Sequence, residues 1–383
     1  MNSDSILPMG DEDKSADNKA IERALNQFFT KANGIVGSEA NYQVLLAVEL
    51  EKEYPGKVRR EHRMAETGRG GVDVVVLSEE GEALAAFELK GGAYNSRNAL
   101  QDVFTEDGNC QDMNKLSKLK VVPAHRWLVA VDAIELGRSL SYRKQIRAAE
   151  TAGSYNVSFA YHGHGDKTFL LAPSGGRVRY PEIGTMQPEI SGKSIDLSTL
   201  ITRQGVERDL IAASQSIQLE ADIVTIIYRS LLAQGYSAKQ IALETYFNFA
   251  PGNMHQRPDI CLFAPGVDGH FNLYPEGNTS RSYDSLKLSM LKLLVEVKGG
   301  RPLLGKKDST LQNIYRKDIE KLNQWKVVIN GAAQRLSLDI PDTAFLFIGV
   351  DLRPYPIHHD VLATISGIAN ENNICFHYVH SPN

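Results

Sequence analysis

The fold is decided by the stretch from Leu293 to Gly300, which reads LLVEVKGG. An apolar run that carries one acid, one lysine two residues later and then paired glycines is unusual. Because side chains alternate along a strand, Glu296 and Lys298 lie on the same face of it, while Val297 points elsewhere. Burying a carboxylate beside an ammonium is too costly without a partner or a task. The stretch therefore predicts a strand that ends in a charged functional site.

A second copy of this stretch lies in the first half of the chain, where Ala86 to Gly92 reads AFELKGG. An aspartate precedes each copy, and further residues around the two copies match in order. The matched pairs, first half first, are Glu39 and Glu220, Glu61 and Glu244, Asp73 and Asp259, Glu88 and Glu296, Lys90 and Lys298, Asp112 and Asp318, Lys115 and Lys321, Asp132 and Asp351, and Tyr161 and Tyr378. The chain is therefore predicted to be a tandem duplication of one α/β unit, with an insertion at 265–287 in the second copy.

Hydrophobic periodicity and turn residues predict the elements of each unit. In the first half we expect helices at 21–32, 38–54, 111–119 and 141–151 and strands at 57–64, 72–77, 83–90, 127–131 and 157–162. In the second half we expect helices at 219–234, 314–328 and 359–370 and strands at 241–249, 259–263, 291–298, 344–350 and 374–380. The two strands at 72–77 and 83–90 are expected to form a hairpin. Each half is thus predicted to be a mixed central sheet flanked by helices.

The length of 383 residues suits two domains rather than one. Residues 1–20 are acidic and polar and are expected to be a disordered leader. The first domain is predicted at 21–172 and the second at 211–383. A connection is predicted at 173–210, because its first part is rich in Ser, Gly and Pro and shows little periodicity.

The composition is that of a globular protein, with 42% hydrophobic and 23% charged residues. A net charge of −4 gives no general attraction to nucleic acid, so any phosphate binding has to come from local basic surface. The three cysteines are scattered without CxxC spacing, which argues against a disulfide framework or a zinc site and favours a reducing compartment. Neither a signal peptide nor a membrane-spanning run is recognisable. A cytoplasmic protein without a membrane partner is expected.

These residues resemble the motif of the PD-(D/E)xK nuclease superfamily, in which an aspartate is followed on the next strand by Glu-x-Lys. The second half has the literal pattern, with Pro258-Asp259 before Glu296-Val297-Lys298. The first half has Val72 in place of the proline, a position that is not a ligand in the family. The resemblance covers most of both halves. It implies two tandem restriction-endonuclease-like domains.

The resemblance also implies roles for individual residues. A hard divalent cation, Mg²⁺ or else Mn²⁺, takes oxygen ligands and can activate water for phosphodiester hydrolysis. The implied metal ligands are the carboxylates of Asp73, Glu88, Asp259 and Glu296 and the main-chain carbonyls of Leu89 and Val297. Lys90 and Lys298 are implied to orient the attacking water or to stabilise the transition state. Glu39 and Glu220 occupy the position of the family's helix acid, which helps to hold a metal or water.

Basic residues near the proposed sites are candidates for contact with the nucleic-acid backbone. Two basic runs, at 57–63 and 301–317, lie close in sequence to the sites. The stretch from Gly300 to Lys307 nearly spells a P-loop but ends in Lys rather than Ser or Thr, so we interpret it as a basic loop. The predicted nucleic-acid contacts are Lys115, Lys321, Arg60, Arg63, Lys306 and Lys307.

Simpler interpretations exist for several of these residues. Glu39 and Glu220 could be first-turn acids favoured by the helix dipole. Glu61 and Glu244 are interpreted as surface charges on strands, and the helix lysines of the predicted contacts could be solvated. An isolated acid-x-lysine pair on a strand is more often a surface ion pair than a site. Its repetition in both halves favours a site here.

The sequence therefore predicts a metal-dependent endonuclease that hydrolyses nucleic acid, preferentially double-stranded DNA, with two sites in one chain. Defence against foreign DNA is a setting that the resemblance suggests, with a second copy of the chain or a defence-complex protein as partner. One alternative is that only one half is active and the other serves DNA binding or assembly. The other is a non-catalytic nucleic-acid-binding or interaction scaffold.

Overall fold

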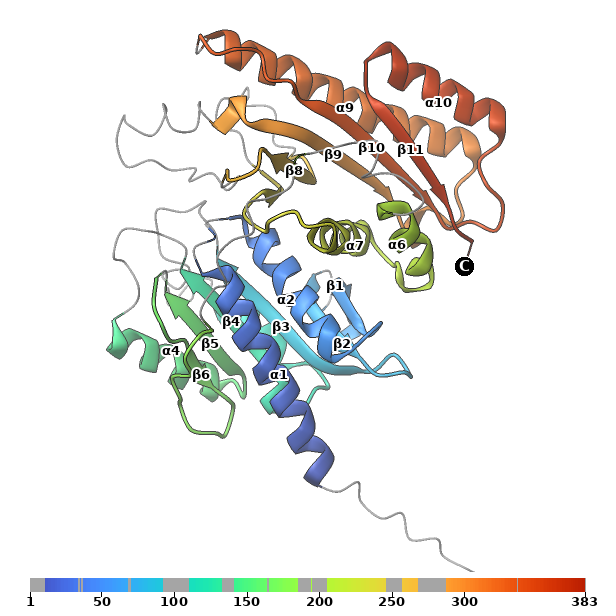
Figure 1. Cartoon of the computed structure of the whole chain (residues 1–383). Coiled ribbons are helices and arrows are strands. Elements are labelled where there is room, and N and C mark those ends of the chain that lie inside the picture. Colours follow the sequence, from blue (N-terminus) through green and yellow to red (C-terminus); the bar gives the residue numbers. More distant parts are fainter. Residues whose placement is uncertain are drawn as a thin grey trace, which may run out of the picture.

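The computed structural model describes residues 11–33, 35, 37–67, 70–91, 110–132, 141–163, 165–184, 194, 205–245, 257–267, 287–335 and 337–382, with side chains from residue 18 onward and without that of residue 110. Predictions that concern residues 1–10, 68–69, 246–249 and most of 265–287 lie outside this description. The described part of the chain contains a sheet of six strands and a sheet of five strands, one in each half (Figure 1). Both sheets are mixed, so the predicted α/β class with a mixed sheet in each half is confirmed.

The first sheet runs in the order β1-β2-β3-β4-β5-β6. Its strands are β1 (Val58–Arg63), β2 (Gly71–Leu77), β3 (Ala83–Gly91), β4 (Arg126–Asp132), β5 (Ser158–Gly163) and β6 (Leu170–Ala172). The hairpin β2-β3 is antiparallel, as predicted, and β3, β4 and β5 are parallel. The helices of this half are α1 (Asp11–Ala32), α2 (Glu39–Glu53), α3 (Cys110–Ser117) and α4 (Tyr142–Ser154), with short 3₁₀ turns at Ala65–Thr67 and Pro123–His125.

The second sheet repeats this arrangement in the order β11-β10-β9-β8-β7. Its strands are β7 (Ile241–Leu243), β8 (Ile260–Phe263), β9 (Leu291–Gly299), β10 (Ala344–Asp351) and β11 (Cys375–His380). As β3 does, β9 pairs antiparallel with the strand before it and parallel with the strand after it. The helices are α6 (Val206–Ala212), α7 (Glu220–Ala233), α9 (Asp308–Arg335) and α10 (His359–Glu371), with 3₁₀ turns at Ser214–Ser216 and Arg301–Leu303.

The two halves share one hydrophobic core. Figure 1 shows α2 and α7 between the two sheets, with α9 and α10 on the outer side of the second sheet. The apolar side chains of α2, α7, β3 and β9 belong to one continuous buried cluster. The outer face of each sheet has its own smaller cluster, under α3 and α4 in the first half and under α9 and α10 in the second. Since α2 is covered by the first sheet, by α1 and by the other half, all of its residues from Ala40 to Leu50 are buried.

Reciprocal polar contacts hold the halves together. The side chain of Asn41 in α2 donates to the carbonyl of Ile241 at 3.2 Å and accepts from the amide of Leu243 at 3.1 Å, both in β7. In return, Asp222 of α7 accepts a hydrogen bond from the main chain of Arg60 in β1. Asn41 and Asp222 are equivalent by the duplication, as each follows its helix acid by two residues. Each half therefore fixes the first strand of the other.

Helix α9 is longer than the predicted helix at 314–328, and β7 ends at Leu243 although a strand was predicted to 249. Three further segments have regular structure where a leader or a connection was predicted. Helix α1 begins at Asp11, inside the segment predicted to be a disordered leader. Residues 173–184, predicted to belong to the connection, return to the first sheet through bridges between Leu171 and Arg179 and between Thr168 and Glu182. Helix α6, also predicted in the connection, packs on α7 and β11. Isolated bridges and short helices leave little periodicity in a sequence, which explains why these segments were interpreted as a linker.

Among the described residues, no helix has both the length and the apolar character needed to cross a membrane.

Candidate metal-binding and catalytic sites

The first predicted site is assembled where β2 and β3 run side by side. Asp73 of β2 accepts a hydrogen bond through Oδ2 from the main-chain N–H of Leu89 at 2.7 Å. Glu88 of β3 is 2% exposed, and its Oε1 lies 2.6 Å from Nζ of Lys115. The same ammonium donates to the carbonyl of Gly71 at 2.9 Å, so the α3 lysine spans both strands. The structure therefore brings together the two predicted carboxylate ligands and one predicted phosphate contact.

The second site repeats the same contacts. Asp259, next to β8, accepts through Oδ2 from the main-chain N–H of Val297 at 2.7 Å. Glu296 is 3% exposed, and its Oε2 accepts from Nζ of Lys321 at 2.7 Å. Lys321 also donates to the carbonyl of Arg257 at 3.0 Å, two residues before the aspartate, as in the first site. Leu89 and Val297 thus have a role that the sequence did not predict, because their amides orient the aspartates.

The lysine of each Glu-x-Lys motif contacts acids of the neighbouring helices. Nζ of Lys90 lies 2.9 Å from Oδ2 of Asp112 in α3. Nζ of Lys298 donates to both carboxylate oxygens of Glu220, at 2.9 and 3.0 Å, and lies 3.9 Å from Asp318 in α9. Burial lowers the pKa of both lysines, but the surrounding carboxylates more than offset this, so that each pKa is raised. Both side chains are therefore ammonium groups at neutral pH and serve as positive charges rather than as bases.

The predicted helix acids lie beside the lysines of the two Glu-x-Lys motifs. Burial raises the pKa of Glu39 to about 7, partly opposed by the charge of Lys90, and Glu39 accepts a hydrogen bond from the main chain of Gly91. The helices can approach the strand ends so closely because glycine follows each lysine. A Cβ at Gly91 would lie 3.0 Å from the ring of Tyr42, and one at Gly299 would lie 2.7 Å from the side chain of Ile223.

Buried carboxylates with raised pKa values characterise both sites. Burial raises the pKa of Glu88 to about 9, and the nearby charge of Asp73 adds to this, while Lys115 opposes it only in part. Burial likewise raises the pKa of Glu296 well above its ordinary value and that of Asp259 to about 6. No residue in the described part of the chain donates a hydrogen bond to Oε1 of Glu296. Carboxylates held together in this way fit a hard divalent cation, which would stabilise their charged form.

Sequence reasoning did not assign Asp112 and Asp318 to the sites. Asp112 forms the ion pair with Lys90. Asp318 lies near Lys298, and its buried Oδ2 accepts no hydrogen bond from any residue that the structure describes. The signal was available, because each acid stands three residues before its helix lysine in both halves. This spacing places acid and lysine on one helix face.

Of the other predicted nucleic-acid contacts, one is buried and three are exposed. Arg60 is 4% exposed, and its guanidinium donates to Gln43 of α2 at 2.9 Å and to the carbonyl of Ala221 in α7 at 3.3 Å. It therefore links the two halves inside the molecule. The remaining predicted contacts, Arg63, Lys306 and Lys307, are exposed.

The two sites adjoin a cleft between the halves. One cavity of about 440 Å³ is lined by Asp73, Glu61 and Arg63 of the first half and by Glu220 and Gly299 of the second. A smaller cavity of about 150 Å³ is lined by residues of both halves, among them Arg60, Glu61, Glu220, Glu244 and Asp259. Acids of both sites therefore face shared space.

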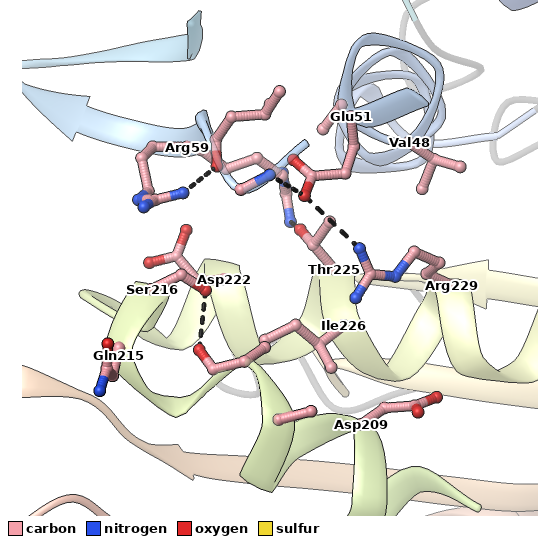
Figure 2. A pocket seen from close by; sticks show the side chains of 16 residues that line it. Val48, Glu51, Arg59, Asp209, Gln215, Ser216, Asp222, Thr225, Ile226 and Arg229 are labelled. Carbon is pink, nitrogen blue, oxygen red and sulfur yellow. Dashed lines mark hydrogen bonds and ion pairs between the residues drawn. The ribbon is translucent and has the colours of Figure 1, made fainter. Parts of the chain in front are cut away.

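A third cavity, of about 330 Å³, also lies between the halves but away from the site carboxylates (Figure 2). Figure 2 shows Arg59 and Asp222 on one side of it and the ion pair of Arg229 with Glu51 on the other. That pair is separated by 3.6 Å. The cavity mixes charges of both signs, and Arg60 is the one predicted site residue in its lining.

A separate group of potential metal ligands lies at the start of α10. His358, His359 and Asp360 each offer a ligand atom, and these atoms lie within 4.8 Å of one another. All three side chains are exposed, and His358 caps the helix. The predicted sites do not include this group.

The raised pKa of the buried glutamates predicts a pH-dependent stability. The protonated form of Glu88 is favoured by folding, so its stabilising contribution is complete below about pH 4.5 and is lost as the pH rises towards 9. We expect the double variant Glu88→Gln, Glu296→Gln to unfold about 3 °C or more above the unmodified protein at pH 8 in EDTA, because glutamine is neutral in both states and avoids the cost of protonating each glutamate on folding at that pH. At pH 5 the difference should vanish. Thermal unfolding at several pH values checks this, and a difference that does not vary with pH would contradict it.

Compared with protein-family models and with the sequences of curated proteins, the chain matches none.

Proposed function

We propose that the protein is a Mg²⁺- or Mn²⁺-dependent nuclease that hydrolyses phosphodiester bonds of double-stranded DNA at two PD-(D/E)xK-like sites. The observation that carries this proposal is the repetition of one arrangement in both halves. Each half has an aspartate held by a strand amide, a buried glutamate on the next strand, and a lysine two residues later whose charge is maintained by helix acids. A purely structural ion pair would not require this whole arrangement in both halves. It would also not require the buried Oε1 of Glu296, which accepts no hydrogen bond from the described residues.

The chemistry follows from what the residues can do. A bound divalent cation supplies Lewis acidity towards the phosphate and lowers the pKa of water. Asp73 with Glu88, and Asp259 with Glu296, would hold that cation. The ammonium groups of Lys90 and Lys298, being protonated, neutralise charge that develops on the phosphate oxygens and orient water. Lys115 and Lys321 keep the glutamates fixed through their ion pairs.

Two sites in one chain could each cut one strand of a duplex. A specific difference between the halves supports a second possibility, in which one half is active and the other binds DNA or assembles. Lys298 is held by both oxygens of Glu220, whereas Lys90 is paired with Asp112. A helix acid bound in this way is less available to a metal or to water. The proposed setting of defence against foreign DNA, with a second copy or another defence protein as partner, rests on the family resemblance alone.

Incubation of the purified protein with supercoiled, linear and single-stranded DNA and with RNA, in Mg²⁺, Mn²⁺ or EDTA, tests the activity. We expect cleavage that depends on a divalent cation and no cleavage in EDTA.

The single variants Asp73→Ala and Asp259→Ala test whether both sites cut DNA. If both sites cut, each variant should leave nicked circles in place of linear product. If one variant abolishes all cutting and the other changes nothing, one half has lost its activity. Absence of cleavage together with absence of metal binding by calorimetry would support the scaffold instead.

A further inference from the structure

Glu61 and Glu244 share an uncommon backbone conformation. Both lie in the left-handed region, with φ of +49° and +46°, and they are equivalent in the duplication. A residue with a Cβ is strained there, and glycine or asparagine is the usual choice. The chain uses asparagine in this conformation at Asn156 and Asn373, which follow α4 and α10. The same strained conformation occurs at equivalent glutamates in both halves. Such strain is characteristic of functional sites rather than of ordinary turns.

The strand register places each of these glutamates beside a predicted metal ligand. In the pairing of β1 with β2, Arg60 lies opposite Val74 and His62 opposite Val72, so Glu61 lies opposite Asp73. In the second half the amide of Glu244 donates to the carbonyl of Asp259 at 3.2 Å. The first half also makes room for the strained residue. A Cβ at Gly71 would lie 2.6 Å from the carbonyl oxygen of Glu61.

Both glutamates also face the cleft. Glu61 lines the larger cavity with Asp73, and both glutamates line the smaller cavity together with Glu220 and Asp259. Near Asp259, the buried Oε1 of Glu296 accepts no hydrogen bond from the described residues, so this oxygen is free to ligate a cation. Charged neighbours of these glutamates include Arg60, which interacts electrostatically with both, and Arg257, whose Nη1 lies 3.7 Å from Oε2 of Glu244.

We propose that Glu61 and Glu244 are positioning carboxylates of the two sites, held by the strained backbone so that each binds the water shell of the cation from the strand opposite the metal-binding aspartate. This inference rests on the proposed function. Mg²⁺ keeps several of its waters when a protein binds it, and groups that hold those waters affect its affinity. The glutamates interpreted from the sequence as surface charges thereby become part of the sites.

Replacement by glycine separates strain from function. The double variant Glu61→Gly, Glu244→Gly is expected to raise the unfolding midpoint in EDTA by about 2 °C, because glycine adopts a positive φ without strain. The same variant should lower Mg²⁺ affinity, measured by calorimetry, by about tenfold. The double variant Glu61→Gln, Glu244→Gln keeps the strain and removes the charge. It should lose affinity without gaining stability.

The double variant Asn156→Gly, Asn373→Gly is the matched control, because it relieves the same conformation at equivalent positions outside the sites. It should gain a little stability and bind Mg²⁺ as the unmodified protein does. Unchanged Mg²⁺ affinity in the glycine variant of the glutamates, with cleavage and metal binding intact in the unmodified protein, would overturn this inference alone. If the unmodified protein neither binds a divalent metal nor cleaves, the proposed function fails and the inference fails with it.

Discussion

Replacing Lys90 and Lys298 together by alanine is expected to lower the rate of DNA cleavage by about 10²–10⁴-fold. The carboxylates around each lysine raise its pKa, so both side chains carry a positive charge at neutral pH. That charge lies two residues from the buried glutamate on the same strand, where it can stabilise a phosphate that becomes more negative. Removing it should slow the chemical step and leave the metal-binding carboxylates in place.

Cleavage should therefore be measured beside metal affinity in the same protein. We expect calorimetry to show Mg²⁺ binding by the double variant at least as tight as in the unmodified protein, because a competing positive charge has been removed. Lys167→Ala is a suitable control, since this lysine is exposed near β6 and its loss should change neither quantity. Cleavage that survives the double substitution would show that the lysines have no part in the reaction.

Replacing Arg60 by leucine is expected to reduce the free energy of unfolding by about 2–4 kcal/mol. The guanidinium is buried, and the substitution removes its hydrogen bonds to the carbonyl of Ala221 and to the buried side-chain oxygen Oε1 of Gln43. Because these groups lie in α7 and α2, losing the hydrogen bonds weakens the contact between the two halves. Urea unfolding, followed by a probe in each half, measures the effect.

The neighbouring arginine provides the control for this measurement. Arg59 lies on the same strand but is half-exposed, and its guanidinium donates to the carbonyl of the adjacent Val58. Arg59→Leu should change stability by no more than about 0.5 kcal/mol. Equal losses for the two arginines would show that Arg60 does not tie the halves together.

Much of the fold was predictable because the chain contains its pattern twice. The strand ending at Gly91 and the strand ending at Gly299 have the same apolar run, the same charges and the same glycines, so each supports the assignment of the other. Helix α2 was recognisable from its apolar face and from Ser38, which caps it by accepting from the amide of Asn41. The segment 173–184 was not recognisable, because its bridges use backbone groups whose pairing leaves no trace in side-chain periodicity.

The residues that make up each site could be predicted from the sequence, but the contacts made by the helix residues could not. The carboxylates and lysines of each motif do meet, since their strand positions determine where they point. The ion pairs of Lys115 and Lys321 with the buried glutamates depend on how the helices pack, which local sequence does not determine. The conformation of Glu61 depends on its partner strand, since Gly71 leaves the space that it needs. Arg60 looked like part of a basic surface run, but the second half covers it.

The reciprocal contacts of Asn41 with β7 and of Asp222 with β1 have the form of an isologous interface, in which a surface binds its own copy. A single-copy ancestor carrying this surface would have assembled as a symmetric homodimer, and duplication would have joined its two subunits covalently. Once joined, the subunits no longer have to remain identical. The two contacts already differ, because one is made by a side-chain amide and the other by a carboxylate. The fused chain can therefore specialise one half while the two halves remain joined.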